Sequence, residues 1–165
     1  MKQSASLDTS FWINCHRVGI LDKIFEYFDL HVCEEVKQEI LSPLLRLGIF
    51  AQDAIIFQQK LDQNEITITN STKTSREIFH TAEDRAIGLA EEKDFMLLID
   101  NGAPFEYAMA HGLKVVNTAS FIVFLYSEER LTIQNARQKL MALRGLIRKS
   151  IIEQNLRRIT VLGGE

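Results

Sequence analysis

The sequence predicts an α/β fold with three layers, in which helices cover both faces of a central parallel sheet of about five strands. Short apolar runs alternate with stretches of helical periodicity along most of the 165 residues. The run at 95–100 is almost continuously apolar, as expected of a central parallel strand that is buried on both faces. Such alternation is typical of βαβ units, whose crossovers place helices on the two faces of a sheet.

Five segments have the character of strands and five that of helices. The strands are expected at 3–8, 29–33, 65–69, 95–100 and 114–117, and the helices at 19–28, 34–47, 52–61, 82–93 and 104–111. Two short sequences match capping boxes, in which side chains three residues apart bond the backbone at a helix start: Thr81 with Asp84, and Ser150 with Glu153. The first is expected to begin the helix at 82–93, and the second the last helix of the chain.

The segment 132–160 predicts a helical appendix and not a further sheet unit. Its apolar residues recur at three- and four-residue steps and so form one stripe, made of Ala136, Leu140, Leu143 and Ile147. Because an isolated helix of this length is marginal in water, the stripe must pack on the same chain or on a second copy in a homodimer. We expect residues 1–165 to form a single domain, since one core is usual at this length.

Composition indicates a soluble globular protein, with 46% hydrophobic and 25% charged residues. No apolar stretch near the N-terminus is long enough for a signal peptide, and the uncharged run at 115–127 is shorter than the ~18–20 apolar residues of a membrane span. The cysteines, Cys15 and Cys33, form no CxxC pattern and are expected to be reduced. We therefore expect a cytoplasmic protein with no membrane partner.

Charge is distributed unevenly along the chain. The formal net charge is −3, yet the segment 130–158 contains eight basic residues and one acidic residue, a net charge of +7. Such a segment is typical either of a surface that follows a phosphate backbone or of a solvated helix face. In the first case the substrate-binding residues are expected on the basic faces of the appendix, at Arg137, Arg144 and Arg148.

Two of the predicted strands end in an acidic residue. Asp8 ends the first strand and Asp100 the fourth. In open parallel sheets, ligands bind beyond the carboxyl ends of the strands, where the strand order reverses. Carboxylates gathered there are costly to bury unless a cation offsets their charge, and oxygen ligands suit Mg²⁺ and Mn²⁺. The sequence therefore predicts a divalent-metal site at this edge of the sheet.

Three further acidic residues lie on helices that could face the same site. Glu39 borders the buried stripe of its helix, with Glu35 as an alternative on the same face; an exposed surface glutamate is the simpler interpretation. Glu83 and Asp84 lie in the first turn of another helix, where acids also complement the helix dipole. The strand-end acids beside them favour a shared site.

These segments resemble the PIN-domain family of metal-dependent ribonucleases, particularly its toxin-like bacterial and archaeal branch. The resemblance covers nearly the whole chain and rests on segments in the family's order, at 7–10, 32–40, 82–90, 95–101 and 112–118. It implies a catalytic set made of Asp8, Glu39, Glu83 and Asp100. Asp8, Glu83 and Asp100 are the implied ligands of one or two Mg²⁺ or Mn²⁺ ions.

The resemblance also implies an activity and partners. Ser10, Asp84 and Asn101 would support the catalytic side chains. The implied reaction is hydrolysis of phosphodiester bonds in single-stranded RNA by a metal-activated water. A role as the toxin of a toxin–antitoxin pair, with a small antitoxin protein as partner, is a further implication of the toxin-like branch.

The sequence departs from the family pattern in ways that leave two alternatives. Ala82 stands where relatives often have glycine, Arg85 where many have a second acid, and Asn101 where aspartate is common. Arg85 and Asn101 lower the negative charge, which favours a PIN-like module that binds RNA or protein without cleavage. An aspartyl phosphotransfer domain fits less well, because Ser10 replaces the second aspartate of one such class and the predicted strand at 65–69 does not end in aspartate.

Overall fold

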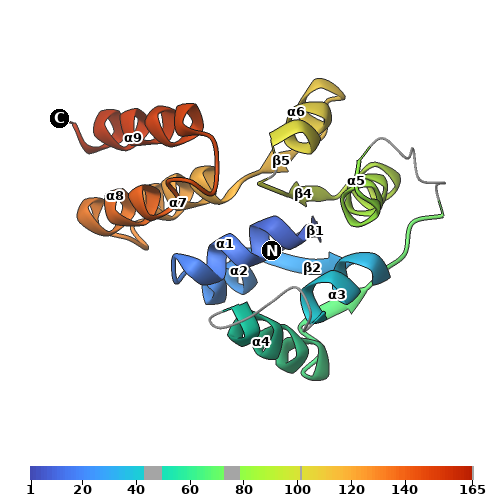
Figure 1. Ribbon diagram of the computed structural model, residues 1–165. Coiled ribbons are helices and arrows are strands. Elements are labelled where there is room, and N and C mark those ends of the chain that lie inside the picture. The colour runs from blue at the N-terminus through green and yellow to red at the C-terminus, as the bar shows by residue number, and fades with distance from the viewer. Residues whose placement is uncertain (43–49, 73–78, 101, 165) are drawn as a thin grey trace.

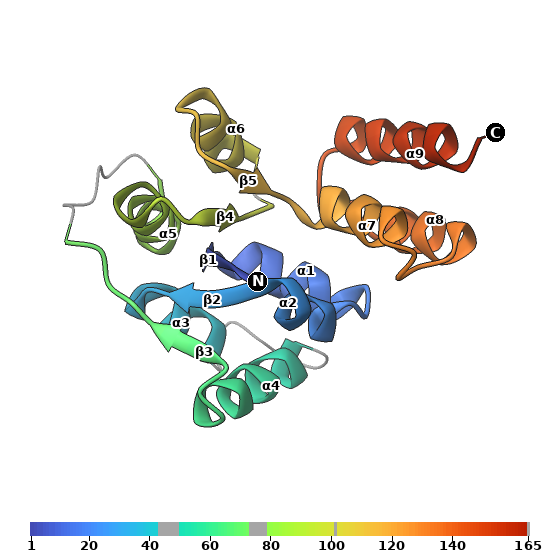
Figure 2. The same cartoon turned by 180° about the vertical axis from the view of Figure 1, so that it is seen from behind.

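The computed structural model describes residues 1–42, 50–72, 79–100 and 102–164 (Figure 1). Five strands form one sheet in the order β3-β2-β1-β4-β5, and every pairing is parallel. The strands are β1 Gln3–Leu7, β2 Phe28–Val32, β3 Ile66–Ile68, β4 Met96–Leu98 and β5 Val115–Val116. Helices lie on both faces of this sheet (Figures 1 and 2). The predicted three-layer α/β/α fold is confirmed.

The helices of the described ranges are α1 Thr9–Arg17, α2 Leu21–Tyr27, α3 Glu34–Leu41, α4 Phe50–Asp62, α5 Thr81–Lys93, α6 Gly102–Ala110, α7 Thr118–Ser127, α8 Ile133–Ala142 and α9 Lys149–Gly163. Each expected strand and helix has a counterpart, although the end of the helix expected at 34–47 lies outside the described residues. α1 and α7 lie outside the expected helical stretches. α7 is buried on most sides, at Ala119, Phe121, Ile122, Val123 and Leu125, so it lacks the one-sided periodicity that identifies a surface helix.

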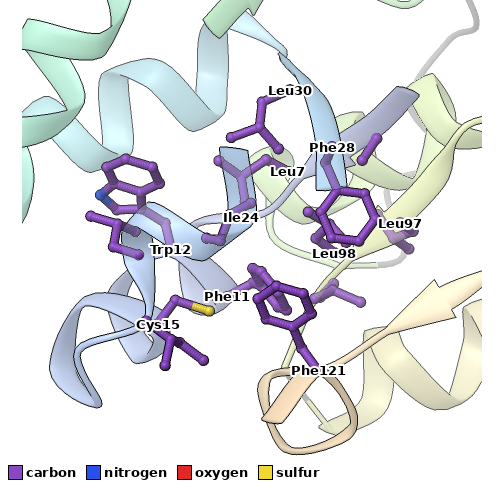
Figure 3. Close-up of a cluster of buried hydrophobic side chains, with 14 of the residues drawn as sticks. Leu7, Phe11, Trp12, Cys15, Ile24, Phe28, Leu30, Leu97, Leu98 and Phe121 are labelled. Atoms are coloured by element: carbon purple, nitrogen blue, oxygen red, sulfur yellow. The ribbon is translucent and has the colours of Figure 1, made fainter. Parts of the chain in front are cut away.

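The core forms against the central strand β1. Leu7, Leu30 of β2 and Leu98 of β4 belong to one buried hydrophobic cluster. Trp12 of α1, in the same cluster, lies edge-on to Phe57 of α4, with ring centroids 5.1 Å apart. Figure 3 shows Leu7, Trp12, Leu30 and Leu98 among the buried side chains of this core. On the other face of β1, the buried Ser6 Oγ donates to the carbonyl of Ala86 in α5 at 2.7 Å. The burial of Trp12 is what holds α1, and therefore its first residues, against the sheet.

The expected capping boxes are wrong, although each lies close to a helix start. α5 begins at Thr81 with His80 as its N-cap, and α9 begins at Lys149 with Arg148 as its N-cap. Neither N-cap side chain bonds the backbone of its helix. Asp84 Oδ1 instead accepts from the backbone N–H of Phe79 at 3.2 Å, before the helix. The serine or threonine of the pattern is therefore the first or second residue of its helix, one or two residues past the N-cap.

The appendix packs on α7 of the same chain, as Figure 1 shows at the C-terminal side of the molecule. Ala136, Leu140 and Leu143 are fully buried, and Ile147 packs against the same hydrophobic core. Burial within one chain is the simpler of the two outcomes expected of this stripe, so homodimer formation stays a prediction. In the described ranges, no helix is both long and apolar enough to cross a membrane.

The start of α7 has the capping box that the sequence analysis missed. Asn117 Oδ1 accepts from the N–H of Ser120 at 2.7 Å, and Ser120 Oγ accepts from the N–H of Asn117 at 3.1 Å. Because Asn117 is buried, we expect Asn117→Ala to lower the free energy of unfolding by ~1–2 kcal/mol, measured by urea denaturation. The control is Thr132→Ala at the exposed N-cap of α8, which should cost less. Equal losses would contradict this account of the α7 start.

Candidate metal site

The strand order reverses between β1 and β4, and two acidic side chains lie at this point. β2 and β3 extend the sheet on one side of β1, and β4 and β5 on the other. Leu7 pairs with Leu98 at the carboxyl ends of these strands, and the N–H of Asp8 donates to the carbonyl of Leu98 at 2.9 Å. Asp8 and Asp100 therefore leave neighbouring strands at the edge where open α/β sheets bind ligands.

Asp8 is the N-cap of α1 and is 1% exposed. Its Oδ2 accepts from the N–H of Ser10 at 2.9 Å and from Ser10 Oγ at 2.5 Å. Its Oδ1 is buried and has no hydrogen-bond partner. Burial raises the pKa of Asp8 from 3.8 to about 7, against the opposing hydrogen bonds from Ser10, and the charges of Glu83 and Glu39 raise it further. Asp8 is thus a buried carboxyl with one oxygen left unpaired.

The dipeptide Thr9-Ser10 connects the ends of three elements. Ser10 Oγ donates to Asp8 Oδ2 and accepts from the N–H of Asp100 at 3.0 Å, so it links the ends of β1 and β4. Thr9 Oγ1 donates to Glu39 Oε2 of α3 at 2.9 Å. These bonds depend on the position of α1 and fix Asp8 and Glu39 relative to one another. The role of Thr9 was not expected from the sequence.

Glu39 and Glu83 approach Asp8 from the helices that follow β2 and β3. Both are half-buried, and both lie close enough to raise the pKa of Asp8. Glu35, the alternative to Glu39, instead forms an ion pair with Arg85 of α5, with Oε1 3.3 Å from Nε. This pair joins α3 to α5, the two helices that carry Glu39 and Glu83.

Asp100 is also buried, at 6% exposure, but both of its carboxylate oxygens accept hydrogen bonds. Oδ1 accepts from the N–H of Thr118 at 2.6 Å, and Oδ2 accepts from Thr118 Oγ1 at 2.6 Å and from Asn14 Nδ2 at 2.7 Å. Burial raises the pKa of Asp100, and the bonds from Thr118 and Asn14 oppose that rise. Sequence reasoning missed both donors. Thr118 directly follows the last predicted strand, so its place at a strand end was a usable signal.

The other expected site residues make different contacts or lie outside the described residues. Asp84 bonds the backbone before α5, and Asn101 lies outside the described residues. Among the arginines of the appendix, Arg137 donates to Thr160 Oγ1 of α9 at 3.2 Å, and Arg144 is exposed between α8 and α9. Arg148 reaches α6, where it pairs with Glu106.

The fit to a metal ion depends on Asp8. Among the side chains that the structure describes, no group of three or more histidines, cysteines, aspartates or glutamates is arranged closely enough to hold a metal ion. Asp8 nevertheless has the chemistry of a cation ligand, because its unpaired Oδ1 is buried with two more acids close by. A divalent cation at Oδ1 would satisfy that oxygen and offset the buried charge. Glu83, whose charge acts on Asp8, would be a second ligand of such an ion.

A comparison with protein families finds one match over nearly the whole chain. A family model described as a PIN domain matches residues 6–160. No curated protein matches the sequence significantly. PIN domains are generally nucleases, so the fold is of a nuclease type. With its parallel sheet, its strand-end acids and this match, the chain belongs to the PIN-domain family.

Proposed function

We propose that this protein is a divalent-metal-dependent nuclease that hydrolyses phosphodiester bonds of single-stranded RNA, with Asp8 as its central metal ligand. The observation that carries the proposal is the buried Asp8 Oδ1, which has no hydrogen-bond partner. The negative charges of Glu39 and Glu83 act on the same carboxyl. A buried carboxylate in such surroundings is stable only when it is protonated or when a cation offsets its charge. The PIN-domain fold supports the second interpretation.

The proposal gives each acid a role. Asp8, Glu39, Glu83 and Asp100 form the catalytic set, and Asp8, Glu83 and Asp100 hold one or two Mg²⁺ or Mn²⁺ ions. A bound divalent cation supplies a water of lowered pKa and shields the charge of the phosphodiester. Ser10 orients Asp8 through its two hydrogen bonds, and Thr9 orients Glu39. Asp100 also holds the start of α7 through Thr118.

Charge and resemblance support the choice of RNA and of partners. The segment 130–158, which contains most of the appendix, has a net charge of +7 in a protein whose net charge is −3, and Arg137, Arg144 and Arg148 are the proposed contacts to an RNA backbone. The similarity to the toxin-like branch supports a toxin that pairs with a small antitoxin protein and forms a homodimer. The ion pair of Arg85 with Glu35 favours a second candidate, a module that binds RNA without cleaving it, because it brings a positive charge to the acidic helices.

The proposal is tested by incubating the purified protein with end-labelled single-stranded RNA. We expect cleavage with Mn²⁺ or Mg²⁺, no cleavage with EDTA, and none by Asp8→Asn, which keeps the size of the side chain and removes its charge. The control is Asp22→Asn, the same exchange at an exposed position of α2, which should cleave as the wild type does. Equal cleavage by Asp8→Asn would contradict the proposal. RNA binding without any metal-dependent cleavage would establish the second candidate.

A further inference from the structure

Arg148 crosses from the start of α9 to the first turn of α6. Its guanidinium pairs with Glu106, one turn into α6, and lies directly over Gly102, the first residue of that helix. A Cβ atom at Gly102 would lie 3.1 Å from both Nε and Nη2 of Arg148, closer than most Cβ contacts in proteins. The guanidinium can take this place because residue 102 has no side chain. We refer to the contact surface of Gly102 and Glu106 as the Arg148 seat.

The Arg148 seat lies beside the candidate metal site. Gly102 is two residues beyond Asp100, so the two Cα atoms are at most ~7 Å apart. The N–H of Asp100 is bonded to Ser10 Oγ, which in turn bonds Asp8. The side chain of Arg148 is 53% exposed and that of Glu106 is 59% exposed, so a ligand can reach the guanidinium from solvent. A positive group thus lies at the rim of a buried acidic site.

We propose that Arg148 binds an RNA phosphate next to the metal site, and that Glu106 holds the guanidinium in place until that phosphate replaces it. The inference rests on the proposed function and deepens it, because it assigns to Arg148, among the three arginines proposed there, the phosphate beside the metal site. Guanidinium and phosphate match in bidentate geometry. Since exposed ion pairs contribute little to stability, exchanging the Glu106 carboxylate for a phosphate costs little.

The neighbouring basic residues lack this arrangement. Arg137 is half-buried and donates to Thr160 within the appendix. Lys149, the next residue after Arg148, is 87% exposed and lies 3.6 Å from Glu153 of its own helix. Lys149 therefore offers a matched control, because its removal changes the net charge by the same amount.

The test measures binding of labelled single-stranded RNA by fluorescence anisotropy over a series of salt concentrations. All variants carry Asp8→Asn and are measured in EDTA, so that no RNA is cleaved. For Arg148→Gln we expect ~5-fold weaker binding at 0.1 M salt. The negative slope of log K against log salt concentration should become shallower by ~0.7, the change expected when one phosphate contact with a single strand is lost. Lys149→Gln should keep the slope of the parent protein.

Two further variants test the seat itself. Gly102→Ala leaves every charge in place but moves the guanidinium, so binding should weaken toward that of Arg148→Gln. Glu106→Gln removes the competing carboxylate, so binding should become tighter. Equal affinities of Arg148→Gln and Lys149→Gln, or unchanged affinity of Gly102→Ala, would overturn the inference even if the wild type cleaves RNA with metal. If no variant binds RNA and the wild type does not cleave it, the proposed function fails together with the inference.

Discussion

Without metal, the protein should become less stable as the pH rises from about 4 to about 8, and Asp8→Asn is expected to remove most of this effect. The pKa of Asp8 is raised from 3.8 to about 7 in the folded protein. Between these values the folded state binds more protons than the unfolded state, so the free energy of unfolding falls as the pH rises. The shift in the pKa of Asp8 lowers the free energy of unfolding by ~4 kcal/mol once the pH is above 7.

Urea denaturation in EDTA between pH 4 and pH 8 measures this effect. The asparagine variant can still accept the hydrogen bonds of Ser10, and it should be more stable than the wild type at pH 8. Part of the pH dependence should remain, because burial raises the pKa of Asp100 as well. Asp22→Asn, on the surface of α2, should follow the wild-type curve. Parallel curves for Asp8→Asn and wild type would show that Asp8 is not held as a costly buried carboxyl.

Replacing Asp100 by alanine should have the opposite sign and destabilise the protein by ~3–5 kcal/mol. Three donors bond this carboxylate, two from Thr118 and one from Asn14. Without it they lie buried with no acceptor, and each unsatisfied group costs ~1–3 kcal/mol. Urea denaturation at pH 7 measures the loss.

The matched variant is Asp100→Asn, whose amide oxygen can still accept from Thr118 or Asn14. It should therefore lose less stability than Asp100→Ala. A loss below ~1 kcal/mol for the alanine variant would mean that water satisfies these donors. Opposite signs at Asp8 and Asp100 would show that these two buried acids differ in their hydrogen bonding: Asp8 has one oxygen without a partner, and Asp100 is bonded on both oxygens.

The fold could be predicted from the sequence where an element had a clear apolar pattern of its own. Strand β4 was expected because its residues are continuously apolar, and the meeting of Asp8 with Asp100 followed from the common direction of parallel strands. α7 was missed because a helix buried on most sides has no amphipathic period. The N-caps of α5 and α9 were misplaced because the capping pattern can also begin at the first or second residue of a helix.

The site could be anticipated only in part. Asn14 bonds Asp100 across 86 residues of sequence, and no local pattern marks an asparagine in the middle of α1 as its partner. The contact of Arg148 with Gly102 and Glu106 depends on where the start of α9 lies relative to α6, and composition does not predict that placement. Basic charge in the appendix was visible from the sequence, but which arginine lies near the acids was decided by tertiary packing.

Calorimetric titration of Mn²⁺ into the RNA-free protein tests most directly whether Asp8 is the centre of a metal site. At pH 8 the wild type should bind one or two equivalents, and binding should weaken toward pH 6, because a proton competes for a carboxyl whose pKa is about 7. Asp8→Asn should bind no Mn²⁺ while remaining folded. Equal binding by the two proteins, or no binding by a wild type that still cleaves RNA, would contradict the account.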